Sequence, residues 1–568
     1  MKTGKRFIDV ALVSDKMNEL PMKNVFSLLI AFLISSTGAT ARKVAPIWEE
    51  QLAAVENGEP APLVDYSYAG YRYGTTAIPQ SFDLPVFKVD DFGAVPDDGK
   101  SDRAAIEAAI AKASQEKGGI VLFSSGRYLL NEKPGSNRGI RIGESNIILK
   151  GQGAGPGGTR LFMRHYLHPE DPERGWTVPF MFTFAPGDFE ANSKAVLDDR
   201  GGAKERVVGT GAGGSFSLEV EDASGFKVGE VVTLAAESKA LVPEIVGERK
   251  LRTLWSRIHQ RGVAVSEKLE IARIDGNRLT FKAPFLNNVT ENVEWWVIHY
   301  PVLENCGFED IHFEGNFRDE FVHHKNREHS TGYSAVRMLA CKDSWVRRCL
   351  MTNTGCAVSL TGSISSTAMM VVIGGNRSHN GMAITFGSRN LVGLTRDVAG
   401  QFHGPAMSHL AVGNVYWRNV TSKPSGPDFH GTFVSHSLYD LNTAASLSNH
   451  GANFRDLPNH LAGAVFWNFH YTGVGEVGRN YWDLLPDEPD RNYGQMAVID
   501  PVIVGLHGGE VSFVESSVGR LELKGEKVYP ESLYEAQLEL RLKRRPRWIE
   551  EAQEEWVNFQ KMLGLELN

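Results

Sequence analysis

Short apolar segments recur in the second half of the chain at the interval of a repeat protein. Segments at residues 345–346, 370–373, 391–394 and 415–417 start 25, 21 and 24 residues apart. Strands of sandwiches and barrels usually follow one another at about 8–12 residues, whereas the units of repeat proteins recur at about 20–50 residues. The spacing therefore predicts an all-β chain in which short parallel strands stack coil upon coil as a solenoid.

A helix is predicted before the first of these coils. Asp102 is a suitable N-cap, and the apolar residues that follow it fall on one face of a helix over 103–116. Gly118 and Gly119 end this helix, and residues 120–123 then read as a strand. The apolar face consists of Ile106, Ala109, Ile110 and Ala113.

Two motifs frame this helix. Residues 91–102 begin with Asp-Phe-Gly-Ala and continue to Asp-Gly and a final Asp, and residues 118–128 run from Gly-Gly-x-Val to Gly-x-Tyr. In this order they resemble the N-terminal region of the pectate lyase superfamily, and in particular its pectate-lyase-3-like members. One departure is a serine where the family usually has proline, which affects a turn and not the fold. The resemblance implies a right-handed parallel β-helix, a fold that hosts lyases, hydrolases, esterases and transferases.

Residues 205–286 interrupt the coil rhythm with short segments that alternate apolar and polar side chains. Such alternation, with turns between the segments, is typical of hairpins, so a small antiparallel β module is predicted to be inserted into the early coils. A basic run at 249–268 lies between its halves and forms either a solvated face or a cationic flap over an acidic substrate. Its members are Arg249, Lys250, Arg252, Arg257, Arg261 and Lys268.

Helical periodicity returns near the C-terminus, over 530–545 and 548–565. We interpret these two helices as a C-terminal helical cap on the last coil. The predicted organisation is then an N-terminal extended segment at 42–85, the start of the β-helix at 86–204, the inserted module at 205–286, the main coils at 287–525 and the cap at 526–568.

The first 41 residues read as an export signal. A largely apolar run of ten residues at 25–34 follows Lys23 and precedes Ala39-Thr40-Ala41, a small-x-small pattern typical of cleavage sites. The run is too short to span a bilayer, so no transmembrane anchor is expected. Because residues 1–21 carry three acidic side chains, Met22 is the expected start of translation. The mature chain is predicted to be secreted or periplasmic.

The charge balance restricts the partners. The chain has 60 Lys and Arg against 68 Asp and Glu, a net charge of −8. A nucleic-acid-binding domain normally shows a basic surplus, so no nucleic acid is expected as a partner. The chain is also predicted to be a monomer. Four cysteines in 568 residues exclude a disulfide scaffold. We expect buried thiols inside the coils, and one disulfide is the alternative.

Histidines provide the candidate active site. His379, His403 and His430 are 24 and 27 residues apart, about one coil each. Three such side chains in register would line one longitudinal groove, although a single histidine is more commonly structural. The other candidate catalytic residues are Arg396 and Tyr333, and the candidate substrate-binding residues are His323, His324, Lys325, Arg327, Arg377, Arg252 and Arg257.

These residue types suit β-elimination from a polymer that contains uronate. The reaction needs a cation to neutralise the sugar carboxylate, a base to remove the C5 proton and an acid to protonate the leaving oxygen. An imidazole titrates near neutral pH, so His403 is the predicted base, and Arg396 is the predicted partner of the carboxylate. Bound calcium is an alternative cation, held by scattered oxygen ligands.

Hydrolysis would instead need two carboxylates. Polygalacturonases, hydrolases of the same fold, carry an adjacent Asp pair, a Gly-His-Gly and an Arg-x-Lys, and none of these occurs between residues 345 and 470. A different pair could come from Asp397, Asp428 and Asp440. The sequence therefore predicts a secreted lyase that acts on an acidic polysaccharide. A glycoside hydrolase and a non-catalytic carbohydrate-binding β-helix are the alternatives.

Overall fold

The structure is a computed structural model that describes residues 42–174, 177–187, 189, 197, 202–247, 251–422, 424–447, 450–451, 453–473, 498–510 and 518–566. The predicted export signal at 1–41 lies outside the described residues, as do Arg249 and Lys250 of the basic run. Residues 45–568 form one compact unit, and β1 (Lys43–Val44) belongs to a separate one. No helix among the described residues is long and apolar enough to cross a membrane.

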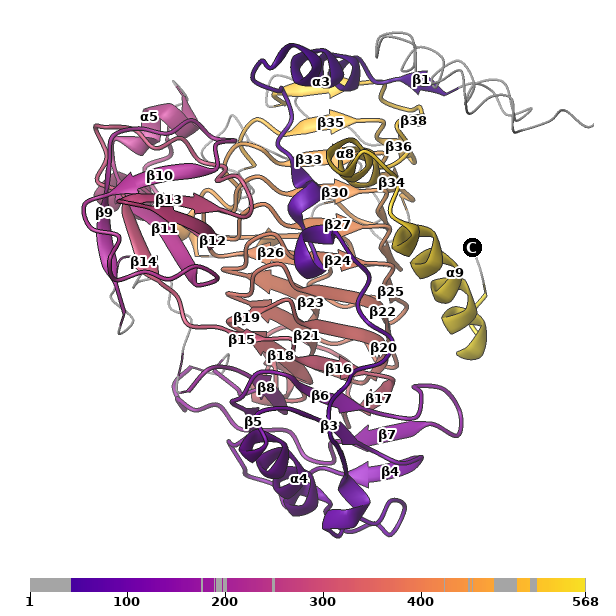
Figure 1. Ribbon diagram of the computed structural model, residues 1–568. Coiled ribbons are helices and arrows are strands. Elements are labelled where there is room, and N and C mark those ends of the chain that lie inside the picture. The colour runs from indigo at the N-terminus through magenta and orange to yellow at the C-terminus, as the bar shows by residue number, and fades with distance from the viewer. Residues whose placement is uncertain are drawn as a thin grey trace, which may run out of the picture. The chain divides into compact units, whose positions relative to one another are not determined.

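Parallel strands stack in three ladders along the unit of residues 45–568 (Figure 1). Two ladders share a 20-stranded sheet, and the third is a separate eight-stranded sheet. Partners lie about one coil apart in the sequence, as where Leu391 pairs with Val415 and Val415 with Leu438. This is the parallel β-helix that the strand spacing predicted. Crossovers between parallel strands are almost always right-handed, the hand that the resemblance implies.

Each ladder follows the chain in order, and most coils contribute one strand to each ladder. The first contains β2 (Val86–Lys88), β3 (Gly119–Leu122), β6 (Ile147–Lys150), β16 (Gly307–Glu309), β20 (Trp345–Thr352), β22 (Thr367–Gly374), β24 (Leu391–Gly393), β27 (Val415–Trp417), β30 (Leu438–Asp440), β33 (Val465–Trp467), β35 (Val502–Val504) and β37 (Arg520–Glu522). The second contains β4 (Gly126–Leu129), β7 (Thr159–Phe162), β17 (Ile311–Glu314), the continuations of β20 and β22, β25 (Arg396–Asp397), β28 (Val420–Thr421), β31 (Thr443–Ala444), β34 (His470–Tyr471) and β36 (His507–Gly508). The third contains β5 (Ile140–Ile142), β8 (Phe182–Phe184), β18 (Val336–Leu339), β21 (Cys356–Thr361), β23 (Asn380–Thr385), β26 (Ala406–Ser408), β29 (Asp428–His430) and β32 (His450–Gly451). The shorter elements of the unit are β15 (Leu303–Glu304), β19 (Cys341–Lys342), β38 (Val528–Tyr529), η1 (Tyr66–Tyr68), η2 (Tyr71–Gly74), η3 (Val89–Phe92), η4 (Phe454–Asp456) and α7 (Arg327–Ser330).

Inward-pointing side chains of the ladders form one hydrophobic core that runs through the coils. Ile384, Met407 and Phe429 occupy neighbouring strands of the third ladder and are fully buried. At the bends, asparagine side chains bind backbone groups of the preceding coil. The Asn414 carbonyl oxygen Oδ1 accepts from the backbone N–H of Asn390 at 2.9 Å, so a buried polar group of the bend is satisfied. The four cysteines are all free and buried.

An antiparallel barrel interrupts the early coils. It is closed in the order β10-β13-β12-β11-β14-β9. Its strands and short helices are β9 (Lys204–Val208), β10 (Ser217–Val220), β11 (Val231–Ser238), α5 (Leu241–Val246), α6 (Ser256–Arg261), β12 (Val263–Asp275), β13 (Arg278–Phe281) and β14 (Trp296–His299). The barrel extends beyond the predicted boundary at 286 because β14 pairs with β9 and β11 instead of with a coil. A short apolar run such as β14 cannot be distinguished by sequence from a coil strand.

Helix α4 (Arg103–Gln115) lies where the sequence predicted it and buries the predicted apolar face against the first coils. Asp102 precedes it but does not cap it through its side chain. Its carboxylate instead accepts from the backbone N–H of Val95 at 3.0 Å and from that of Leu129 at 2.8 Å. Asp102 therefore ties the turn before the helix to β4.

The N-terminal segment is not extended throughout, because it begins with α3 (Pro46–Asn57). Pro46 at the first turn and Gly58 in the left-handed region (φ 70°) are ordinary start and stop signals. The backbone N–H of Ile47 donates to both carboxylate oxygens of Glu522 in β37, at 3.1 and 3.2 Å. Helix α3 therefore covers the last coil, and the chain then runs back along the coils towards β2 (Figure 1).

The C-terminal helices α8 (Leu533–Leu542) and α9 (Arg547–Met562) lie along the side of the coils. The carboxylate of Asp440 in β30 accepts from the backbone N–H of Leu533 at 3.1 Å. Glu555 of α9 forms an ion pair with Arg348 of β20 at 3.1 Å. The pair therefore spans the coils from β30 to β20, which differs from the predicted cap on the last coil.

Candidate active site

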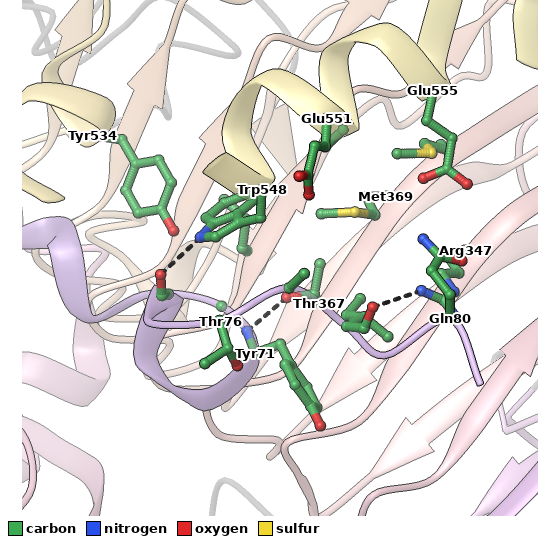
Figure 2. Close-up of a pocket in the computed structure, with 17 residues that line it drawn as sticks. Tyr71, Thr76, Gln80, Arg347, Thr367, Met369, Tyr534, Trp548, Glu551 and Glu555 are labelled. Carbon is green, nitrogen blue, oxygen red and sulfur yellow. Dashed lines mark hydrogen bonds between the residues drawn. The ribbon is translucent and has the colours of Figure 1, made fainter. Parts of the chain in front are cut away.

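Figure 2 shows a pocket between α9, the N-terminal segment and the coils. It has about 50 Å³ and is lined by residues of the N-terminal segment, the coils and the C-terminal helices. The Tyr71 backbone N–H donates to Oγ1 of Thr367 at 2.8 Å, and Trp548 Nε1 donates to the Gly74 carbonyl at 3.0 Å. A cavity needs about 10–15 Å³ of such space to hold one water, so we interpret this pocket as a gap with room for a few waters. The histidines lie elsewhere.

His379, His403 and His430 lie on successive coils along the third ladder. His379 and His403 come shortly before β23 and β26, and His430 ends β29. The ring centroid of His403 lies 4.9 Å from that of His379 and 5.9 Å from that of His430. The register of the coils therefore brings three imidazoles from distant parts of the sequence into one row.

His403 and Asp428 form a buried pair within this row. Nδ1 of His403 lies 3.1 Å from Oδ2 of Asp428, and the residues are 7% and 1% exposed. A carboxylate at Nδ1 holds the ring in one orientation and leaves Nε2 as the atom that can take a proton. That Nε2 lies 3.4 Å from Nε2 of His323. In the sequence, Asp428 was only one of three candidates for a second carboxylate.

The loop between β17 and β18 brings two further histidines to the row. The exposed rings of His323 and His324 have centroids 3.8 Å apart, and that of His323 is 5.3 Å from His379. The ring of His323 also stacks on Phe402, with centroids 4.2 Å apart, and the Arg377 guanidinium lies 5.6 Å from the centre of the Phe402 ring.

The same three imidazoles could hold a metal ion. One nitrogen from each of His323, His324 and His379 lies within 4.8 Å of the others. Imidazole nitrogens suit zinc and other transition metals, whereas calcium prefers oxygen ligands. Calcium, which the sequence left open, does not fit this group of residues.

Burial shifts the titration of these rings. It lowers the pKa of His323 to about 4 and that of His379 well below the usual range of histidine, with further lowering by the neighbouring imidazoles. Burial likewise lowers the pKa of His409, whose ring stacks on that of His430, to about 3. Near neutral pH these three rings are therefore uncharged.

A cavity of about 330 Å³ opens beside His430 and is lined by three arginines. Arg257 and Arg261 come from α6 of the inserted barrel, and Arg455 comes from η4. Arg257 and Arg261 both lie near the Glu237 carboxylate, at 3.6 and 2.5 Å. Among the residues that the structure describes, Arg455 makes no ion pair. The other residues lining the cavity are Ser256, Gln260, His409, His430, Gly431, Thr432, Asn453 and Asp456.

The basic run of the inserted module therefore borders the histidine row at its His430 end. Arg252 of the same run does not line the cavity, and its carbonyl accepts from Nε2 of His259 at 2.8 Å. Arg455 and Asp456 were not among the sequence candidates, because a short polar stretch that ends in a 3₁₀ turn carries no motif.

Arg396 does not join the histidines. It lies in β25 of the second ladder, and its Nη1 donates to Oε1 of Gln560 at 3.2 Å and to the carbonyl of Glu566 at 2.5 Å. A bend separates this strand from His403, so seven residues of sequence carry the chain to a different face. The predicted role of Arg396 as carboxylate partner is corrected to a contact with the C-terminal helix.

Tyr333 is 3% exposed, belongs to the hydrophobic core and packs its ring edge-on against Tyr166, with centroids 6.1 Å apart. Two of the predicted substrate-binding cations face other groups. Arg327 donates to the carbonyl of Pro172 at 2.8 Å, and Lys325 lies 3.8 Å from Asp319. These three residues are not part of the site that we describe.

The other candidate carboxylates have structural partners. Asp397 accepts from the backbone N–H groups of Gly400 and Gln401, each at 2.9 Å, and burial raises its pKa to about 6. Asp440 binds the start of α8, and burial raises its pKa to about 7. Asp428 is therefore the one member of this trio that contacts the histidine row.

Two family models match parts of the chain. Residues 86–176 match the family described as rhamnogalacturonase A/epimerase, pectate lyase-like, and residues 400–552 match a domain of unknown function, DUF4955. No curated protein sequence matches the chain.

Several solved structures resemble the chain at low sequence identity. DFA-IIIase from Arthrobacter chlorophenolicus A6 is 10% identical, with a TM-score of 0.40 and 81% of this chain and 89% of that one covered. The tailspike protein gp49 from Pseudomonas phage LKA1 is 13% identical, with a TM-score of 0.38 and coverage of 77% and 74%. An exopolygalacturonase from Thermotoga maritima is 10% identical, with a TM-score of 0.33 and coverage of 79% and 96%. The stacked parallel coils show that this chain is a parallel β-helix protein, and its residues 86–176 are similar to the pectate-lyase-like family.

Proposed function

We propose that this protein cleaves an acidic polysaccharide by β-elimination, with His403 as the general base. The observation that carries the proposal is the buried His403–Asp428 pair, in a row that ends at an arginine-lined cavity. The family match at 86–176, whose description names rhamnogalacturonase A, supports action on a carbohydrate.

The roles follow from the geometry. Asp428 holds Nδ1 of His403, so Nε2 removes the proton from C5 of a uronate. The electron pair of that C–H bond becomes the C4–C5 double bond, and the C4–O bond to the leaving sugar breaks. His430, with its ring centroid 5.9 Å from that of His403, protonates the leaving oxygen.

The cavity supplies the cation that this chemistry needs. A uronate carboxylate held by Arg257, Arg261 and Arg455 would be neutralised, which makes the adjacent C5 proton more acidic. The neighbouring Glu237 carboxylate offsets part of the charge of Arg257 and Arg261, so Arg455 is the arginine expected to contribute most. The protein is proposed to work as a monomer after export to the periplasm or the exterior.

Hydrolysis is the second candidate function. Asp456 lines the same cavity as His430 and would supply a second carboxylate in addition to Asp428. A hydrolase places two carboxylates about 5–9.5 Å apart across the scissile bond. A non-catalytic carbohydrate-binding role is the third alternative.

A glycan panel tests these alternatives. The purified chain is incubated with acidic polysaccharides while ultraviolet absorbance and reducing ends are followed together. A lyase produces both new reducing ends and the absorbance of an unsaturated uronate, a hydrolase produces only reducing ends, and a binding protein produces neither.

The base is tested on the glycan that is cleaved. His403→Ala is expected to lower turnover by about 10²–10⁴-fold. The matched control is His168→Ala, because His168 stacks on Tyr166 outside the row, and this variant should have the turnover of the wild type. Wild-type turnover of folded His403→Ala would exclude His403 as the base.

A further inference from the structure

We propose that His323, His324 and His379 bind one divalent transition-metal ion, such as zinc. Zinc–imidazole bonds of about 2.0–2.1 Å place tetrahedral ligand nitrogens about 3.4 Å apart. One nitrogen of each of the three rings already lies within 4.8 Å of the others. Small rotations of the two exposed rings are therefore sufficient to close the set around an ion.

His379 provides an independent reason for a ligand here. It is 9% exposed, and neither of its ring nitrogens has a hydrogen-bond partner among the described residues. Buried polar atoms in proteins are nearly always paired with protein groups, water or ions. A metal ion between His379 and the loop would satisfy one of these nitrogens.

Apolar side chains pack against the group. Lys325 and Arg327 follow the two loop histidines directly, but they contact Asp319 and the Pro172 carbonyl, at 3.8 and 2.8 Å. The rings of the group are packed instead by Phe321 and Phe402, whose centroids lie 6.1 Å from His379 and 4.2 Å from His323. An apolar shell around nitrogen ligands lowers solvent access and strengthens binding.

The donor set selects the metal. Three imidazoles without a carboxylate suit zinc, copper, nickel or cobalt, and they do not suit calcium or magnesium, which require oxygen ligands. The ion would join the loop between β17 and β18 to the coil of β23. This inference does not depend on the proposed function, since metal binding is measured without any glycan.

Metal titration tests the inference on the full chain, prepared without a histidine tag and treated with a chelator. Calorimetry with Zn²⁺ and absorption spectroscopy with Co²⁺ should each give one ion per chain, and excess Ca²⁺ should not compete. His324→Ala removes an exposed ring and is expected to weaken binding by about tenfold or more. His379→Ala should weaken it further, and the control His168→Ala should bind as the wild type does.

Two outcomes would overturn the inference. One is the absence of stoichiometric Zn²⁺ and Co²⁺ binding by the folded wild-type chain. The other is unchanged affinity in His324→Ala, whose exposed side chain makes the variant informative even if His379→Ala does not fold. Circular dichroism establishes the folded state of each variant before titration.

Discussion

Nδ1 of His403 lies 3.1 Å from Oδ2 of Asp428, although the two residues are 25 positions apart in the sequence. The coils bring them together, because Ala406 of β26 pairs with Asp428 of β29. Both side chains are buried, so the carboxylate holds the ring without competition from bulk water. This pair is the basis of the catalytic proposal, and it gives the first prediction.

Asp428→Asn should lower turnover by about 10²–10⁴-fold. An asparagine amide has nearly the same shape, but it no longer stabilises the imidazolium or selects the tautomer with a proton on Nδ1. The measurement is kcat on the glycan that the panel identifies, with Asp83→Asn, an exposed aspartate of the N-terminal segment, as control. Wild-type turnover of folded Asp428→Asn would contradict the assignment.

Arg455→Gln should lower kcat for an acidic glycan and should also raise KM several-fold, because the proposed cation both binds the carboxylate and acidifies the C5 proton. Arg455 lines the cavity beside His430, so its loss removes a positive charge from the expected position of the carboxylate. Initial rates over a range of substrate concentrations separate the two constants. The effect should shrink as salt is added, because exposed charges are screened. An unchanged KM at low salt would remove the cavity from the proposed substrate site.

Arg396→Gln provides the matched arginine control and is itself a prediction. Its guanidinium binds Gln560 and the Glu566 carbonyl, so its loss should loosen the C-terminal end of α9. The expected cost is on the order of 1 kcal/mol, seen as faster hydrogen exchange in α9. Turnover at saturating substrate should be unchanged. A large loss of turnover with α9 intact would restore the catalytic role that the sequence predicted.

Ile47→Ala should lower the free energy of unfolding by about 2–5 kcal/mol. Ile47 is 2% exposed on α3, the helix that covers the last coil, and the substitution leaves a cavity at that end of the solenoid. Val55→Ala on the same helix is the control. Val55 is 48% exposed, so this substitution should lower the free energy of unfolding only slightly. Urea denaturation of the two variants gives the comparison, and equal midpoints would argue against α3 as a stabilising cap.

The protein should lose stability as the pH falls below about 6.5. Burial lowers the pKa of His409 and His460 to about 3 and that of His436 to about 4, compared with about 6.5 in an unfolded chain. The unfolded chain therefore binds more protons across this range. The stability that these neutral rings allow is present above pH 6.5 and is lost as the pH falls through the folded pKa values.

Buried carboxyl groups have the opposite sign, and burial raises the pKa values of Asp65, Asp102, Asp343, Asp397 and Asp440. Burial raises the pKa of Asp397 to about 6 and that of Asp440 to about 7, so their contribution is present at low pH and is lost as the pH rises through these values. The buried histidines outnumber them, so the urea midpoint should decrease between about pH 7 and pH 4.5. His460→Phe, which cannot take up a proton, should reduce that decrease. A midpoint that is independent of pH would contradict this balance.

Much of the architecture follows from the sequence alone, because a solenoid maps sequence interval onto position. Strands about 21–25 residues apart predict stacked coils, and histidines 24 and 27 residues apart predict neighbours on successive coils. Helix α4 is equally predictable, because the apolar residues on its buried face recur with helical periodicity in the local sequence. These features depend on period and composition, which a single sequence contains.

Tertiary structure decided which of the candidates meet. Arg396 in β25 contacts α9, although it is only seven residues from His403, because the bend after β25 carries the chain to a different face. Bend angles depend on packing and not on spacing. The loop with His323 reaches the row from 80 residues earlier in the sequence, and α6 brings Arg257 to His430 from the inserted barrel. Ile47 meets Glu522 across 475 residues. Such contacts arise where loops and helices dock on finished coils, and no local pattern in the chain specifies where that docking occurs.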